Sequence, residues 1–176
     1  RQMCIRDSKQ LMGQIAPASS TKLSAWPKDL DGWMLLPGIG RTTAGGILSS
    51  AFNSPLAILD GNVRRVLARL HAHPRPPARD QALCWQWSGA LIEAAPGRAR
   101  DLNQALMDLG ATVCTPRSPN CACCPWQTHC TAYAAGDVER YPVKDTPRAV
   151  PFHVIGVGVV LNEAGEVLID QRLNEG

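Results

Sequence analysis

Five of the seven cysteines in this 176-residue chain lie within one stretch of seventeen residues. Disulfide frameworks belong to secreted chains, so a cluster this dense favours a metal or cluster site. Four of these cysteines have the spacing C-x6-C-x2-C-x5-C and are Cys114, Cys121, Cys124 and Cys130. Four thiolates so close in sequence can surround one tetrahedral ion or one cubane cluster. The stretch 114–130 is therefore predicted to fold around an inorganic centre.

The spacing favours an iron-sulfur cluster over zinc. Zinc ribbons usually offer two short-spaced cysteine pairs, and only Cys121 and Cys124 form such a pair here. Two neighbouring residues, Cys123 and His129, could compete as ligands. A free thiol and a histidine without a ligand role are the simpler interpretation of these two residues.

The chain ahead of the cysteines has the periodicity of amphipathic helices. Apolar residues recur at i, i+3, i+4 and i+7 within 44–51, 63–70 and 83–94, which predicts that each stretch is a helix with one face in a core. A further helix is expected to open with a capping box that begins at Asp101 and to stop at Gly110. These patterns predict a mostly α-helical domain.

The two ends of the chain differ from this helical part. Residues 131–151 hold three prolines and mixed charge, which favours an extended interdomain linker. Residues 152–176 contain two apolar runs separated by NEAGE, the pattern of a β-hairpin, which is marginal by itself in water. Residues 1–23 show no periodicity and remain an unassigned remnant or artefact. We therefore expect a fragment that is truncated at both ends.

A glycine-rich turn, LPGIG at 36–40, precedes the first helical stripe. Without a Cβ, Gly38 and Gly40 allow backbone amides to approach a phosphate closely. The N-terminus of a helix starting near Arg41 adds a favourable dipole for an anion. Such contacts would position DNA without reading its sequence. An ordinary turn between helices is the alternative for this motif by itself.

An acidic residue, Asp60, follows an apolar run and precedes the second stripe, where it would cap a helix. A carboxylate at a helix N-terminus is stabilised as the anion and stays charged at neutral pH. A cap with no further role is the simpler interpretation. Its position about twenty residues after the glycine turn raises the possibility of a second role.

These motifs occur in the order and at the separations found in the helix-hairpin-helix DNA glycosylases. Over residues 24–176 the chain resembles the adenine DNA glycosylase (MutY) family, through LPGIGRTTAGGIL, AILDGNVRRVLARL and the cysteine loop. The resemblance implies a mostly α fold with a helix-hairpin-helix domain at 24–113 and a [4Fe-4S] cluster loop at 114–130. The linker 131–151 would then lead to the first β-hairpin of a Nudix-like α+β domain at 152–176.

The resemblance implies base excision repair, in which adenine mispaired with 8-oxoguanine or guanine is hydrolysed from double-stranded DNA after it is flipped out of the stack. Asp60 would be the catalytic anion beside the electron-poor sugar, and Asn62 and Thr42 would line the substrate pocket. The implied ligands of a [4Fe-4S] cluster are Cys114, Cys121, Cys124 and Cys130. The implied DNA contacts are Pro37, Gly38, Ile39, Gly40, Arg41 and Arg117.

Thr42 distinguishes the chain from the neighbouring endonuclease III family, which has a catalytic lysine at this position. A threonine hydroxyl cannot form the Schiff base that drives strand cleavage, so the resemblance implies a monofunctional glycosylase. Two alternatives remain open. One is an endonuclease III-like glycosylase and lyase, and the other is a noncatalytic iron-sulfur module that only binds DNA.

The proton donor implied by the resemblance is missing. The family takes it from a glutamate well before the hairpin, whereas the first glutamate of this chain is Glu93, in a different predicted helix. We therefore expect the fragment alone to be inactive, or nearly so.

The charge pattern gives weaker information about partners. The formal net charge is +3, and residues 41–100 hold eight arginines against three acidic residues. Such an excess fits a polyanion partner or a solvated basic face, and Arg65 and Arg69 would share one side of a helix in either case. Because no apolar run approaches a membrane span and no leader is evident, we expect a cytoplasmic monomer, associated with the nucleoid if bacterial.

Overall fold

The computed structural model of the chain describes residues 26–146, 152, 154 and 158–168. The chain divides into two compact units, residues 1–145 and 146–176. The described part of the first unit is helical. The described part of the second unit contains one antiparallel bridge, between Leu161 and Val167. The mostly α fold class is confirmed for the described residues.

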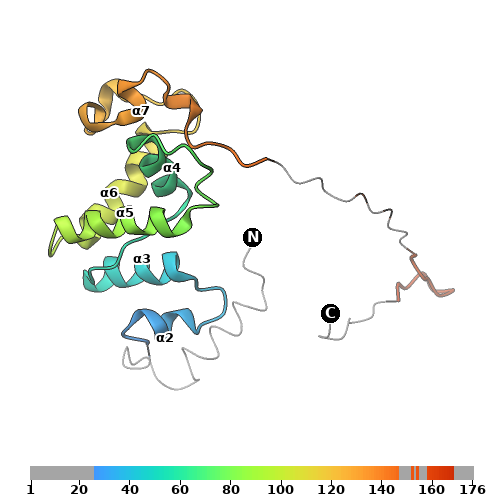
Figure 1. Cartoon of the computed structure of the whole chain (residues 1–176). Helices are drawn as coiled ribbons and strands as arrows, with labels where there is room; N and C mark the ends of the chain where they lie inside the picture. Colours follow the sequence, from blue (N-terminus) through green and yellow to red (C-terminus); the bar gives the residue numbers. More distant parts are fainter. Residues whose placement is uncertain (1–25, 147–151, 153, 155–157, 169–176) are drawn as a thin grey trace. The chain divides into compact units, whose positions relative to one another are not determined.

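Six α-helices organise residues 26–145, the described part of the first unit. They are α2 (Leu30–Met34), α3 (Arg41–Phe52), α4 (Gly61–Leu70), α5 (Gln81–Ala94), α6 (Ala99–Asp108) and α7 (Thr131–Ala134). A π-helical turn and three 3-10 turns follow α6, namely η2 (Leu109–Val113), η3 (Cys121–Cys123), η4 (Gln127–His129) and η5 (Val138–Arg140). Figure 1 shows α2 and α3 at one end of this unit, α7 at the other, and α4, α5 and α6 between them.

Helix α4 is central, because it contacts α5, α6, α7 and η2. Its apolar face buries Val63, Val66 and Leu67 in the main core, as the periodicity predicts. Removing such side chains from water is the main source of stability for a small helical unit. A smaller core between α2 and α3 holds Trp33, Ala44 and Leu48. The described helices include none that is both long and apolar enough to cross a membrane.

The predicted bounds of α6 are wrong at both ends. The helix begins at Ala99, and Asp101 lies in its first turn, where it pairs with Arg98 at 3.5 Å instead of capping. The helical conformation does not end at Gly110, because the π-helical turn η2 continues it from Leu109 to Val113. Gly110 is needed for a close approach, since a Cβ there would lie 2.6 Å from the Cβ of Asn62.

The segment after the cysteine loop lies largely within the first unit, which ends at residue 145. Residues 131–134 form α7, and Ala132 is fully buried. The sequence predicts an extended linker over 131–151, so the structure differs from this expectation in its first part. The apolar contact of α7 with α4 is the physical reason.

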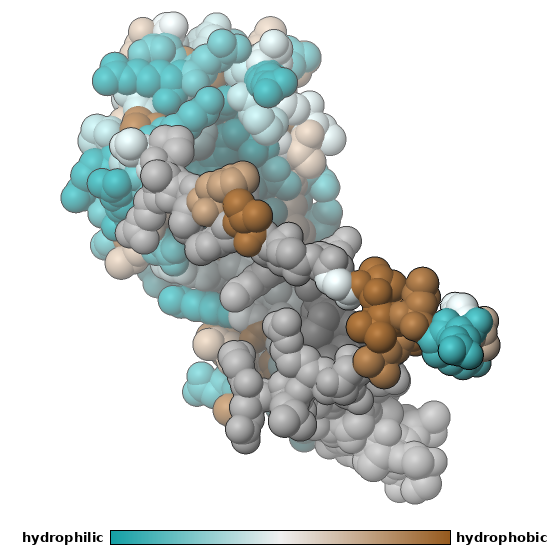
Figure 2. Space-filling view, turned by 90° about the vertical axis from the view of Figure 1, so that its right-hand side faces the viewer, coloured by the Kyte–Doolittle hydropathy of each residue, from teal (hydrophilic) through white to brown (hydrophobic). Residues whose placement is uncertain are grey.

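In the second unit, a tight turn joins the bridged residues. The side-chain oxygen of Asn162 accepts hydrogen bonds from the backbone N–H groups of Ala164 and Glu166. The apolar side chains of the segment 158–168 are exposed, as Figure 2 shows. No strand is assigned among the described residues of 152–168, so the Nudix-like hairpin stays a prediction. The expectation for residues 1–23 lies outside the described residues.

Candidate nucleic-acid interface and catalytic site

The glycine turn joins α2 to α3. The N–H of Ile39 donates to the carbonyl of Leu36 at 3.1 Å, and Gly38 has a φ of +76°, the left-handed region that favours glycine. Gly40 is the N-cap of α3, and no side chain caps that helix. No atom lies within 4 Å of the position that a Cβ on Gly40 would take. The start of α3 is therefore open to an external group.

Arg41, the first residue of α3, is exposed but held in place. Its guanidinium carbon lies 4.1 Å from the centroid of the Trp85 ring, a cation–π contact. Trp85 extends from α5 and is partly buried against the main core. The guanidinium of Arg41 is thus oriented by the Trp85 ring. The sequence patterns did not single out Trp85.

Asp60 is the N-cap of α4, as predicted. Its Oδ1 accepts a hydrogen bond of 2.7 Å from the backbone N–H of Val63. The hydroxyl of Thr42, in the first turn of α3, donates to the carbonyl of Leu59 at 3.2 Å. This bond brings the open start of α3 next to the capped start of α4. The predicted hairpin, Thr42 and Asp60 therefore belong to one region of the surface.

Arg65 connects the start of α4 to the cysteine loop. Its Nη2 donates to Asn62 Oδ1 at 2.9 Å and to the Gly110 carbonyl at 2.6 Å. Its Nε donates to the carbonyl of Cys114 at 2.8 Å. Burial lowers the pKa of Arg65, and the nearby Cys114 opposes that shift. The guanidinium is therefore committed to internal acceptors, and Asn62 is fixed by it.

Arg69, one turn further along α4, is 1% exposed. It donates to the Cys114 sulfur at 3.3 Å, to the Thr115 carbonyl at 2.7 Å and to the Tyr141 carbonyl at 2.9 Å. Both sequence interpretations, a DNA-facing surface and a solvated helix face, are thus wrong for Arg69, whereas Arg65 is only partly buried. The signal that could have found this role is the spacing i, i+3, i+7 of Asn62, Arg65 and Arg69, a polar stripe next to an apolar one.

The four predicted cysteine ligands line one small apolar cavity together with Arg69 and Val113. Burial raises the pKa of Cys121, and the sulfurs of Cys114, Cys124 and Cys130 raise it further, while Arg69 lowers it. Thiols that repel one another's charge are suited to a cationic centre, which stabilises their deprotonated form. The donor set therefore fits a group bound by four thiolates.

Cys123 and His129 are both exposed and do not line this cavity. The sulfur of Cys123 instead accepts a hydrogen bond of 3.4 Å from Asn120 Nδ2. Within the described ranges, no three His, Cys, Asp or Glu side chains converge as one metal ion would require.

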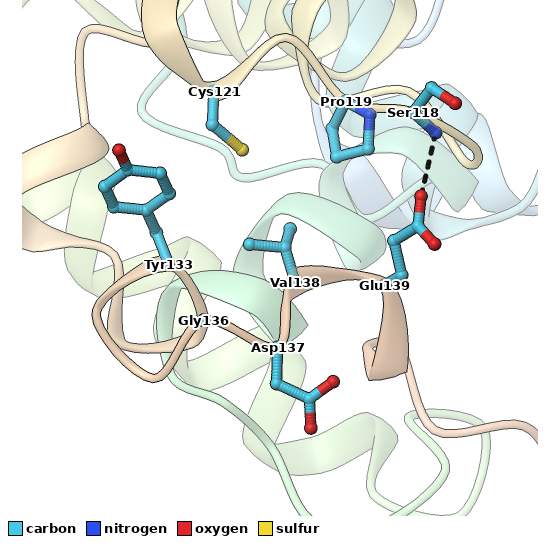
Figure 3. Close-up of a pocket in the computed structure, with 8 residues that line it drawn as sticks. All are labelled: Ser118, Pro119, Cys121, Tyr133, Gly136, Asp137, Val138 and Glu139. Carbon is cyan, nitrogen blue, oxygen red and sulfur yellow. Dashed lines mark hydrogen bonds between the residues drawn. The ribbon is translucent and has the colours of Figure 1, made fainter.

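Arg117 lies at the exposed tip of the cysteine loop. The tip is held by the Thr115 hydroxyl, which donates to the Arg117 carbonyl at 3.0 Å, and by the N–H of Ser118, which donates to Glu139 Oε1 at 3.3 Å. Figure 3 shows the second bond at the edge of a cleft of about 520 Å³, with the Cys121 sulfur directed into it. Glu139, in η5 after α7, thus holds the tip of the cysteine loop in place.

Comparison with known proteins relates the chain to DNA glycosylases. It is 41% identical over 130 residues to the adenine DNA glycosylase of Schizosaccharomyces pombe, a match that covers 69% of this chain and 28% of that protein. By sequence, the chain is a relative of the adenine DNA glycosylases. The enzyme of that name from Mus musculus is 48% identical over 99 residues, with 56% of this chain and 19% of that protein covered.

The chain thus spans less than a third of the length of these adenine DNA glycosylases. No family model matches it. Among solved structures, a thermostable thymine-DNA glycosylase is similar, with a TM-score of 0.55 and 31% identity over 62% of this chain and 50% of that one. The helical unit therefore has the helix-hairpin-helix glycosylase fold that the sequence predicts.

Proposed function

We propose that this chain is part of a base excision repair enzyme that hydrolyses the N-glycosidic bond of adenine mispaired with 8-oxoguanine or guanine. The observation that carries the proposal is the hydrogen bond from Thr42 to Leu59, which joins the open start of α3 to the start of α4 capped by Asp60. A surface for a phosphate and a carboxylate for a developing cation then lie next to each other. The similarity to adenine DNA glycosylases supports the choice of base.

DNA would be held through its backbone. The uncapped amides of α3, the stacked Arg41 and the exposed Arg117 offer positive charge without any pattern that reads bases. The adenine would leave the stack to reach the site. The binding contacts must offset the cost of unstacking, and oriented groups such as Arg41 lose less entropy on binding.

Asp60 would act on the sugar. As the glycosidic bond lengthens, positive charge develops on the deoxyribose, and a fixed carboxylate stabilises that charge better than mobile water does. The hydrogen bond from Val63 keeps the carboxylate oriented. Thr42 offers no amine for a Schiff base, and its hydroxyl already donates to the protein. Hydrolysis without strand cleavage follows from these two residues.

The four cysteines that line one cavity would hold a [4Fe-4S] cluster. When bound, the cluster supplies a fixed crosslink within the loop rather than a reaction with the substrate. The chain's own residues carry its effect outward, because Arg69 contacts the Cys114 sulfur and Arg65 joins the Cys114 carbonyl to Asn62. The cysteine loop, which includes Arg117, is thereby fixed to the start of α4 at Asn62.

The 176-residue chain by itself would excise adenine slowly or not at all. Its first glutamate, Glu93, is exposed on α5, and none precedes the hairpin. General acid catalysis typically contributes about 10²- to 10⁴-fold, so a chain without that group should bind the mispair and turn over little.

The test measures binding and excision separately. A labelled duplex with one A:8-oxoguanine pair is mixed with the chain, and with a chimera that carries the N-terminal segment of the Schizosaccharomyces pombe relative ahead of residue 26. Binding by both proteins and single-turnover excision by the chimera are expected. Asp60→Asn keeps a capping oxygen but removes the charge, so the chimera should lose about 10²- to 10³-fold in rate and keep its affinity.

The noncatalytic iron-sulfur DNA-binding module is the competing candidate, because the open start of α3 and the stacked Arg41 could hold DNA without any chemistry. If the chimera binds the duplex without releasing adenine, that candidate is correct. If the chimera excises adenine and Asp60→Asn is as fast as its parent, the assignment of the catalytic residue is wrong. Failure of both proteins to bind DNA would contradict both candidates.

A further inference from the structure

A second cleft lies between the start of α4, the tip of the cysteine loop and the segment that follows η5. Its volume is about 560 Å³, and Gly61, Arg117 and Lys144 are among the residues that line it. It thus joins the residue next to Asp60 to a segment that sequence analysis treats as a linker. No sequence motif marks Lys144, and the predicted DNA contacts do not include it.

The segment 141–145 is fixed at both ends. The carbonyl of Tyr141 accepts a 2.9 Å hydrogen bond from the buried Arg69. Asp145 forms an ion pair with Arg79, whose Nε lies 3.2 Å from its carboxylate. Lys144 lies between these two anchors, so its backbone is held beside the cleft. The hydrogen bond from Arg69 to Tyr141 contributes more to holding the segment, because an exposed ion pair such as that of Arg79 and Asp145 adds little stability by itself.

The free charges on the cleft are positive. In the described part of the chain, neither Arg117 nor Lys144 has an acidic partner within ion-pair distance. Arg65 reaches the cleft but is committed to internal acceptors, and the one carboxylate there, that of Glu139, bonds the Ser118 N–H. Among the described residues, no neighbouring atom lies within 4 Å of the position that a Cβ on Gly61 would take, so the cleft is open beside Gly61.

We propose that Lys144 binds a backbone phosphate of the DNA, in the same cleft as Arg117, and that the segment 141–145 is therefore part of the DNA interface. The proposal rests on the proposed function and extends it to a residue outside the hairpin and the cysteine loop. Two cations on fixed backbone beside one cleft, neither with an acidic partner in the described part of the chain, are complementary to a phosphodiester. An ammonium group binds phosphate as a point charge, so the contact carries no sequence preference.

The experiment measures the affinity of the 176-residue chain for a duplex with one A:8-oxoguanine pair between 50 and 200 mM salt. One phosphate contact contributes about one unit to the slope of log K against log salt. Lys144→Gln should therefore weaken binding several-fold at low salt and reduce that slope by about one. An undamaged duplex should show the same change in slope. Lys144→Arg should restore both quantities.

Arg98→Gln is the matched control, because it removes one positive charge from an exposed site at the start of α6. It should leave the slope unchanged. The proposal is overturned if Lys144→Gln keeps the parental slope, or if it and Arg98→Gln change the slope equally. If the parent chain binds neither duplex, the proposed function fails as well, which separates that failure from the failure of the Lys144 contact.

Discussion

Helices α3 and α4 start next to each other, and their N-termini are built in opposite ways. The N-cap of α3 is Gly40, which has no side chain to bond the first amides. The N-cap of α4 is Asp60, whose carboxylate bonds the N–H of Val63. The hydroxyl of Thr42, in the first turn of α3, links the two by donating to the Leu59 carbonyl.

The difference shows how the partial positive charge at a helix N-terminus can serve either DNA binding or catalysis. The first amides of a helix carry partial positive charge and need an acceptor. At α3 that acceptor would come from outside, as a DNA phosphate. At α4 the chain supplies its own carboxylate, which the Val63 N–H orients and which would face a cationic transition state. The predictions at Arg65, Arg41, Asp60 and Gly40 each act on one of the two starts and leave the other intact, and a last one concerns the far end of α4.

The largest effect on stability is expected from Arg65, which ties the start of α4 to the loop. Arg65→Gln leaves the carbonyl of Gly110 without its guanidinium donor and the carbonyl of Cys114 with only the bond from Arg69, so the free energy of unfolding should fall by about 2 kcal/mol. Arg41→Gln, at the start of α3, loses an exposed cation–π contact worth about 0.5–1 kcal/mol. Urea unfolding of both variants measures the difference.

The same pair should show the reverse order in DNA affinity. Arg41→Gln removes a charge that faces solvent, whereas Arg65→Gln removes one that faces the protein. Equal losses of stability in the two variants, or a larger loss of stability in Arg41→Gln, would contradict the distinction between an outward and an inward arginine.

A smaller effect is expected from the caps themselves. Asp60→Ala removes the side-chain acceptor of α4 and should lower the free energy of unfolding by about 1 kcal/mol. Gly40→Asp gives α3 a cap that it lacks and should raise that free energy by a few tenths of a kcal/mol, about the gain of Asp over Gly at this position. Urea midpoints at constant m-value test both. Shifts in the same direction for the two variants would show that the starts do not differ as described.

The smallest effect lies at the other end of α4. His71, the C-cap, stacks on Trp87 with ring centroids 4.2 Å apart, and burial followed by the charge of His73 lowers its pKa. The unfolded state therefore binds the proton more tightly, so the free energy of unfolding should fall as the pH drops below about 6.5. His71→Gln should flatten that fall, while the exposed His129→Gln should not.

Sequence reasoning predicted the apolar stripe of α4 and the cap at Asp60, because both depend on local spacing and local hydrogen bonds. It failed at Gly110, where the requirement is a close approach to Asn62 in another helix. It also misassigned Arg69, since an arginine on a helix gives no local sign that its guanidinium is buried against carbonyls far along the chain. Contacts between distant segments decided these cases.

The segment after the cysteines shows the same limit. Prolines and mixed charge predicted an extended linker from residue 131, but the small side chain of Ala132 lets α7 pack on α4. The cysteine spacing, by contrast, grouped four residues that do line one cavity, which Cys123 does not line. Spacing is informative there because the four residues lie close together along the chain, and their role as ligands stays a prediction.

The central claim is that the open start of α3 receives a DNA phosphate. The most direct test compares the affinities of Gly40→Asp and Gly40→Asn for the same A:8-oxoguanine duplex at low salt. Both variants cap the helix and fit the open space at Gly40, but only the first places a negative charge at the start of α3. The account predicts that Gly40→Asp binds about tenfold more weakly than Gly40→Asn, a difference of about 1.4 kcal/mol that narrows as salt is raised. Equal affinities for the two variants would contradict it.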